Sequence, residues 1–157
     1  MIAVLAAAAV GLLSAFLPFT PAEPYVIAAV ATTGTPPVAL GVAAAIGQTA
    51  GKTLIFLTAR GALRTPWLRR RLGQAGPSRP RGRLRAAGAK LVEVMDRPGP
   101  ALGVLLASGV TGFPPLLAVS VYLGRTPMGP VTFAATCLVG RTVRFVTLAL
   151  APHLIGF

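Results

Sequence analysis

Residues 38–59 read VALGVAAAIGQTAGKTLIFLTA, an apolar run of 22 residues that holds one charged side chain, Lys52, and no proline. At about 1.5 Å per residue, a helix of this length crosses a hydrocarbon core of about 30 Å. A second run, residues 131–151, has 21 residues and reads VTFAATCLVGRTVRFVTLALA. The two runs predict two full transmembrane helices, and hence an all-α integral membrane protein.

The composition of the chain agrees with a membrane protein. Of its 157 residues, 54% are hydrophobic and 11% are charged, and its mean hydropathy is +0.74, which is too apolar for an ordinary soluble domain. The single cysteine, Cys137, excludes an internal disulfide, and the single histidine, His153, excludes a site built from several histidines. We therefore expect no metal, no cofactor and no hydrolytic or redox enzyme. Residues 1–19 lack a basic start and a clear cleavage site, so we expect them to remain in the mature protein.

Positive charge is concentrated between the two apolar halves. The chain has 15 Lys and Arg against three acids, and residues 60–97 hold eleven of those basic residues and two of the acids. Because basic residues that flank spans stay in the cytoplasm, we expect this loop to be cytoplasmic and the protein to be multi-pass in the cytoplasmic membrane. A nucleic-acid partner would explain the charge but not the two apolar spans, so we expect none.

The basic loop defines three parts of the chain. Residues 1–59 form a first membrane repeat, residues 60–97 the basic cytoplasmic loop, and residues 98–157 a second membrane repeat. Within the loop, residues 67–72 and 84–95 combine apolar with basic side chains, so we expect both to lie at the interface, on anionic headgroups.

Prolines interrupt the apolar sequence ahead of each predicted span. Proline removes a backbone donor and disfavours the helical conformation of the residue before it, so we expect re-entrant breaks at Pro21, Pro24, Pro114 and Pro115. The apolar segments 25–33 and 116–123 are too short to cross a bilayer and are predicted to be half-helices. Broken helices at membrane depth occur only where protein or water covers the freed backbone groups, so they indicate a site.

The two halves share a pattern of prolines and glycines. A shift of 90 residues pairs Pro24 with Pro114, Gly34 with Gly124, and Pro37 with Pro127, and a shift of 89 pairs Gly51-Lys52-Thr53 with Gly140-Arg141-Thr142. With the charge rule, this pattern predicts two inverted repeats, each a re-entrant (broken) helical hairpin followed by a full transmembrane helix. The alternative is two unrelated helical hairpins rich in glycine and alanine.

Four ionisable side chains inside the apolar halves are candidate substrate- or ion-binding residues. Glu23 either serves function at the first broken tip or caps the helix that opens there. Arg141 and Arg144 share a face near the middle of their span and should face protein or water. They either pair with Glu23 or with helix-end carbonyls, or they bind an anion such as phosphate, which arginine holds bidentately. Lys52 either joins such a site or partly snorkels toward the cytoplasm.

Small residues mark the expected helix contacts. Gly47 and Gly51 form a small-xxx-small pair that lets another helix approach closely. Gly140, the counterpart of Gly51 in the second half, is expected to do the same.

Several motifs resemble those of the DedA family, also called the VTT or SNARE-associated Golgi protein family. In the first half they are Pro21-Ala22-Glu23, Gly47-x-x-x-Gly51, Phe56 and Ala59-Arg60-Gly61. In the second half they are Gly112-Phe113-Pro114-Pro115, Gly124-Arg125-Thr126-Pro127-Met128, Phe133 and Gly140-Arg141. The resemblance covers residues 20–61 and 104–150. It departs from the family at Phe56 and Ala59, where tyrosine and glycine are usual, and in lacking the arginine that often precedes the second re-entrant proline.

The resemblance implies two re-entrant hairpins that face each other across the bilayer, and a transporter or scramblase of lipids or lipid-linked phosphate. In that reading Glu23 is a protonatable or gating carboxylate, and Arg141 and Arg144 meet the headgroup phosphate. Membrane lipids with anionic headgroups are then the partners, and a homo-oligomer is expected because so short a chain encloses little cavity. The alternative is a non-transporting membrane scaffold whose basic loop binds anionic lipid or an acidic partner.

Overall fold

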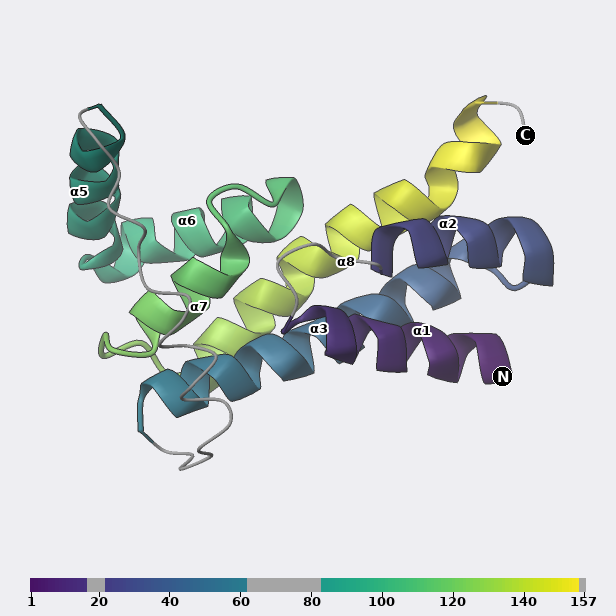
Figure 1. Cartoon of the computed structure of the whole chain (residues 1–157), viewed down its shortest axis with the longest axis horizontal. Helices are drawn as coiled ribbons and strands as arrows, with labels where there is room; N and C mark the ends of the chain where they lie inside the picture. The colour runs from purple at the N-terminus through teal and green to yellow at the C-terminus, as the bar shows by residue number, and fades with distance from the viewer. Residues whose placement is uncertain (17–21, 62–82, 156–157) are drawn as a thin grey trace.

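The computed structural model describes residues 1–16, 22–61 and 83–155 (Figure 1). These residues form seven helices and no strand. The helices are α1 (Ile2–Ser14), α2 (Ala22–Thr33), α3 (Pro37–Ala59), α5 (Arg83–Met95), α6 (Pro98–Thr111), α7 (Leu116–Leu123) and α8 (Pro130–Ile155).

Two of these helices are long and apolar enough to cross a membrane. They are α3 and the part of α8 from Pro130 to Ala151, which confirms the two long apolar helices that the sequence predicts. Each begins one residue earlier than the predicted run, at Pro37 and at Pro130. Proline suits the first helical position because its missing N–H would have no partner there.

The two short apolar segments for which the sequence predicts helices form α2 and α7. α7 has the bounds that the sequence predicts, with Pro115 as its N-cap residue. α2 begins at Ala22, so Pro24 lies inside its first turn rather than before it. A proline costs little there because the first four N–H groups of a helix have no intrahelical partner. Pro21 lies outside the described residues.

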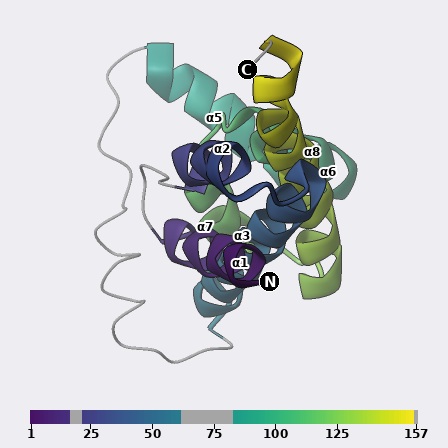
Figure 2. The same cartoon turned by 90° about the vertical axis from the view of Figure 1, so that its right-hand side faces the viewer.

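The helices of the two halves pack crosswise around α3 and α8. α1 lies along α3, and α6 lies along α8, whereas α2 packs on α8 and α7 packs on α3. Figure 1 shows α1 and α2 at one end of this arrangement and α6 and α7 at the other, and Figure 2 shows the bundle end-on. α2 and α7 therefore each contact the long helix of the opposite half.

α3 and α8 run antiparallel. The start of α3 meets the later part of α8, since a Cβ on Gly41 would lie 3.0 Å from the backbone nitrogen of Val146. The end of α3 meets the start of α8, where the rings of Phe56 and Phe133 stack with centroids 4.4 Å apart. The buried apolar side chains form two clusters, one between α1, α2, α3 and α8 and the other between α3, α6, α7 and α8.

Glycines mark the closest helix contacts. Gly47 and Gly51 both face α1, and a methyl group on Gly47 would overlap the backbone carbonyl of Ala8. Gly140 faces Gly109 of α6, and a Cβ on Gly140 would lie 3.1 Å from the Gly109 Cα. The structure thus places all three predicted packing glycines at helix–helix contacts.

The basic loop is described only in part. Residues 62–82, which include the predicted interfacial segment 67–72, lie outside the described residues. The other predicted segment, residues 84–95, lies in α5, which extends beyond α6 at one edge of the molecule (Figure 1). Met95 is buried at the end of α5 against the second apolar cluster, whereas Val92 and Val94 are exposed.

Candidate functional site

The strongest polar contact inside the bundle joins α2 to α8. Arg144 donates from Nε and from Nη2 to the same oxygen of Glu23, Oε1, at 2.8 and 2.5 Å. Glu23 lies in the first turn of α2, where a carboxylate is favoured by the helix dipole. The two side chains are 30% and 22% exposed, Glu23 being the more open. The pair is therefore partly buried.

The same guanidinium also reaches the end of α6. Nη1 of Arg144 donates to the backbone carbonyl of Val110 at 3.1 Å, which satisfies one of the carbonyls that a helix end leaves free. Gly112 is the C-cap residue of α6 and has φ +82°. A Cβ there would lie 3.1 Å from Arg144 Nη1. Arg144 thus holds the start of α2 next to the turn that follows α6.

A second polar group lies deeper, between α1, α3 and α8. Lys52 of α3 is 4% exposed and Arg141 of α8 is 6% exposed. Lys52 Nζ donates to the carbonyl of Ala15, the C-cap residue of α1, at 2.6 Å. Arg141 Nε is buried and has no hydrogen-bond partner among the described residues. The two cations lie close enough for their charges to repel each other.

Further buried polar groups surround Lys52. Gln48, one turn earlier on α3, donates from Nε2 to the Ser14 hydroxyl at 3.0 Å, and that hydroxyl donates to the carbonyl of Gly11 at 2.8 Å. The other amide atom, Gln48 Oε1, is buried without a partner. Neither Gln48 nor Ser14 stands out as a site residue in the sequence. A signal for Gln48 is nevertheless present in the sequence. It is an amide side chain one turn before a lysine, inside an otherwise apolar span.

The charges of this region do not balance. The whole chain has three acidic side chains, and two of them lie at the end of α5, where Asp96 accepts from the Tyr122 hydroxyl and Glu93 lies 4.0 Å from Arg97. Glu23 is therefore the one side-chain carboxylate available to Arg144, Arg141 and Lys52. These four side chains carry a net charge of +2.

The structure thus divides the four predicted binding residues into two adjacent groups. Glu23 and Arg144 form an ion pair, and Arg141 lies with Lys52. The two groups are not independent, because Arg141 is within electrostatic reach of both Glu23 and Arg144. Among the described residues, no three His, Cys, Asp or Glu side chains come together as a metal site would require.

Arg60 connects the end of α3 to the turn between α7 and α8. It donates to the carbonyls of Gly124 at 3.3 Å and Thr126 at 2.8 Å, and also to the carbonyl of Met128. Its guanidinium lies 4.7 Å from the centroid of the Phe56 ring, within the range of a cation–π contact. In the sequence Arg60 is only part of the Ala59-Arg60-Gly61 motif, and no contact is predicted for it.

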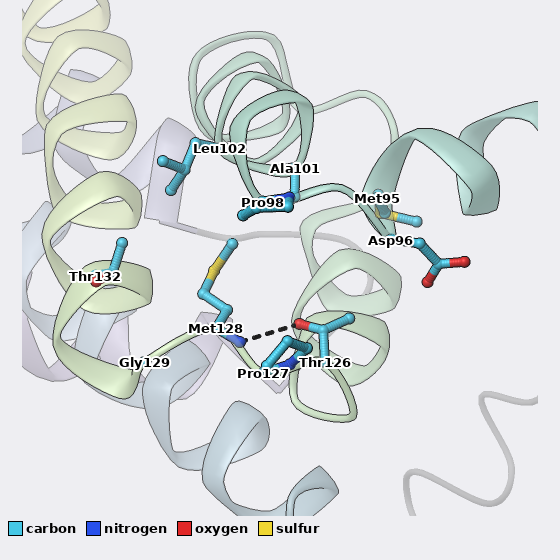
Figure 3. Close-up of a pocket in the computed structure, with 10 residues that line it drawn as sticks. All are labelled: Met95, Asp96, Pro98, Ala101, Leu102, Thr126, Pro127, Met128, Gly129 and Thr132. Atoms are coloured by element: carbon cyan, nitrogen blue, oxygen red, sulfur yellow. Dashed lines mark hydrogen bonds between the residues drawn. The ribbon is translucent and has the colours of Figure 1, made fainter.

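The turn that Arg60 holds forms one wall of a pocket of about 360 Å³ (Figure 3). The opposite wall comes from the end of α5 and the start of α6. The lining residues are Met95, Asp96, Pro98, Ala101, Leu102, Thr126, Pro127, Met128, Gly129 and Thr132. In Figure 3 the Met128 side chain points between Pro98 and Leu102, and the Asp96 carboxylate points away. The pocket is mostly apolar and is separate from the buried cations.

Comparison of the chain with models of protein families, with curated proteins and with solved structures finds no match. The resemblance to the DedA family therefore rests on the quoted motifs.

Proposed function

We propose that this protein is a membrane protein of the DedA type that moves lipids or a lipid-linked phosphate between the two leaflets of the bilayer. The observation that carries the proposal is the contact of Arg144 with Glu23 and with the Val110 carbonyl. A charged pair inside an apolar helical bundle is costly to maintain and is common where a polar group must pass.

The crosswise packing of the helices supports a pair of inverted repeats. α2 contacts α8 and α7 contacts α3, so each broken segment lies against the long helix of the other half. Secondary transporters built from inverted repeats place their binding site at such an interface, where broken helices meet. Arg144 is at this interface, between the first turn of α2 and the last turn of α6.

The chemistry of Arg144 suits a phosphate headgroup. Two N–H donors of its fork now hold one carboxylate oxygen, and the same fork can hold two oxygens of a phosphate in a bidentate manner. In the proposed cycle, the headgroup phosphate replaces Glu23 on Arg144 and thereby separates α2 from α8. Re-formation of the ion pair closes the path after the lipid has left. Glu23 thus acts as a gate, and Arg144 as the group that meets the phosphate.

The basic segment 60–97 belongs on the cytoplasmic side in this proposal. Its Lys and Arg side chains would attract anionic headgroups, at roughly 1 kcal/mol for each basic residue near the surface. The exposed apolar side chains of α5 would enter the headgroup region, as in other amphipathic interfacial helices. A second copy of the chain would enlarge the path, since one copy of 157 residues encloses little space.

The concentration of charge in residues 60–97 favours a second candidate function, a membrane scaffold that does not transport. Its basic loop would then bind anionic lipid or an acidic partner. Charge reversal across Arg69 to Arg71 should abolish that activity, whereas neutralising Glu23 and Arg144 should leave it intact.

Transport into vesicles tests the leading proposal. Purified protein is reconstituted into vesicles with a fluorescent anionic phospholipid, and the rate at which the label changes leaflet is followed by quenching from outside. We expect Arg144→Gln to slow the exchange roughly ten- to a hundredfold, because it removes a charge-assisted hydrogen bond to the phosphate. Glu23→Gln should change the rate in the other direction, because it removes the contact that closes the path. Arg125→Gln, which changes an exposed arginine, is the control and should keep the wild-type rate. Wild-type rates in both gate variants would refute the assigned roles.

A further inference from the structure

The buried cations between α1, α3 and α8, Lys52 and Arg141, have no carboxylate partner, unlike Arg144, which is paired with Glu23. Lys52 and Arg141 are both more than nine-tenths buried, and no side-chain carboxylate contacts either of them. The C-terminal carbonyl of α1 partly offsets the charge of Lys52. Arg141 has no such partner for its Nε. Burying an unpaired cation costs several kcal/mol, so this arrangement needs a counter-charge.

The helix geometry brings the two cations toward the same level of the bundle. Side chains lean toward the N-terminus of their own helix. Because α3 and α8 are antiparallel, Lys52 leans along α3 toward the level of Arg141, and Arg141 leans along α8 toward the level of Lys52. The charge of Arg141 acts on Lys52, which agrees with this approach. The two side chains therefore lie at the same level of the bundle and within electrostatic reach of each other.

The unused polar atoms nearby define what would fit there. Arg141 Nε offers a buried donor, and Gln48 Oε1 offers a buried acceptor one turn before Lys52. An anion that carries both bare oxygens and a hydroxyl satisfies donors and acceptor together, as hydrogen phosphate does. Chloride would meet the cations but would leave the amide oxygen without a donor. A carboxylate could accept from Arg141 Nε but has no hydroxyl to donate to Gln48 Oε1. It is therefore less suitable than a partly protonated phosphate.

We propose that Lys52, Arg141 and Gln48 form a second site, distinct from the Glu23–Arg144 gate, that binds one phosphate-type oxyanion between α1, α3 and α8. The near-complete burial of both cations favours a free anion over a whole lipid, although a lipid phosphate has the same chemistry. The bound anion would neutralise the net charge of +2 that Glu23 leaves in this part of the bundle. It would thereby stabilise the contacts between α1, α3 and α8.

Binding of inorganic phosphate by the full chain in detergent tests this site without any transport step. Equilibrium dialysis with radiolabelled phosphate, in a buffer free of other oxyanions, should give about one phosphate per chain. Phosphate should also raise the unfolding temperature, whereas sodium chloride at the same ionic strength should not. Absence of both effects in the wild-type protein would overturn the proposal.

Substitutions locate the bound anion. Lys52→Gln removes the charge but keeps a donor for the Ala15 carbonyl, and Arg141→Gln removes the second cation. Each should weaken phosphate binding roughly ten- to a hundredfold, the effect of losing one charge-assisted hydrogen bond. Arg125→Gln, at an exposed position, should bind phosphate as the wild type does. Undiminished binding by Lys52→Gln, or loss of binding only in Arg144→Gln, would refute the assignment.

A competition experiment identifies the source of the phosphate. Displacement of the labelled phosphate by phosphatidic acid in mixed micelles, but not by phosphatidylcholine, would show that lipid headgroups enter the same site. Retention of the label would restrict the site to the free anion. Because only binding is measured, a negative result leaves lipid movement through the Glu23–Arg144 gate untouched, and a failure of transport leaves this site untouched.

Discussion

Arg144 holds Glu23 through two hydrogen bonds to a single carboxylate oxygen, across 121 positions of sequence. This contact fixes α2, which has only 12 residues, to the middle of the longest helix in the described part of the chain. The link adds to the apolar packing of α2, which buries Ala22, Val26, Ala29 and Val30. The ion pair is therefore important for the fold as well as for the proposed gate.

A double-mutant cycle on Glu23→Gln and Arg144→Gln should reveal this coupling. Each single variant should lose about 1–3 kcal/mol of unfolding free energy, because it leaves a partly buried charge without its counterpart. The double variant should lose less than the sum, by about 1 kcal/mol or more. Denaturant unfolding in detergent gives the four free energies. Strict additivity would mean that the contact contributes nothing to stability.

Gly112 should be intolerant of a side chain. Its φ of +82° and its approach to Arg144 Nη1 predict that Gly112→Ala lowers the unfolding free energy by about 1–2 kcal/mol, the cost of a left-handed backbone for an L-residue. Gly103→Ala is the matched control in α6, because a Cβ at Gly103 has nothing within 4 Å. That change should be neutral, or should stabilise the helix by up to about 1 kcal/mol. Equal effects of the two substitutions would contradict this account of Gly112.

Arg60 should be irreplaceable by lysine, even though the charge is retained. Its planar fork reaches three backbone carbonyls between residues 124 and 128 and also stacks on Phe56, which a single ammonium cannot reproduce. Hydrogen exchange of the backbone amides at residues 124–129 should be faster in Arg60→Lys than in the wild type. Arg125→Lys, at an exposed position, should leave that exchange unchanged. Protection that survives Arg60→Lys would show that the turn is held by other contacts.

The sequence predicts those parts of the fold that depend on local signals. The two long helices follow from unbroken apolar runs, and the bounds of α7 follow from Pro115 and Gly124, which flank it. Pro24 predicts a helix boundary, but α2 begins earlier, at Ala22. The first turn of a helix tolerates proline, so the proline does not mark the start of this helix.

Which of the two arginines pairs with Glu23 could not be predicted from the same signals. Arg141 and Arg144 are three residues apart, and at about 100° per residue their directions differ by roughly 60° around the helix. That difference is enough to direct Arg144 to α2 and α6 and Arg141 to α3. The choice of partner for Glu23 depends on how α8 packs against its neighbours, and this packing cannot be predicted from a single sequence. Contacts to backbone carbonyls, such as Arg144 with Val110 and Lys52 with Ala15, leave no pattern in the sequence.

Tyr122 should report the attachment of the α5 end to α7 through its titration. Its hydroxyl donates to Asp96 Oδ1 at 2.5 Å, and this hydrogen bond, followed by burial and the negative charge of Asp96, raises the pKa of Tyr122 above its ordinary value of 10.0. A raised pKa means that the contact favours the neutral hydroxyl. Its contribution to stability is therefore fully present below pH 10 and is lost as the pH rises through the raised pKa.

Ultraviolet absorbance of the phenolate measures this titration directly. Tyr25→Phe leaves Tyr122 as the one tyrosine of the chain, and its midpoint should lie above that of a free tyrosine. Adding Asp96→Ala removes the acceptor and the charge, so the midpoint should fall back toward pH 10. Glu93→Ala is the control, since Glu93 faces Arg97 rather than Tyr122, and should leave the midpoint in place. An unchanged midpoint in the Asp96→Ala protein would mean that α5 is not joined to α7 through this hydrogen bond.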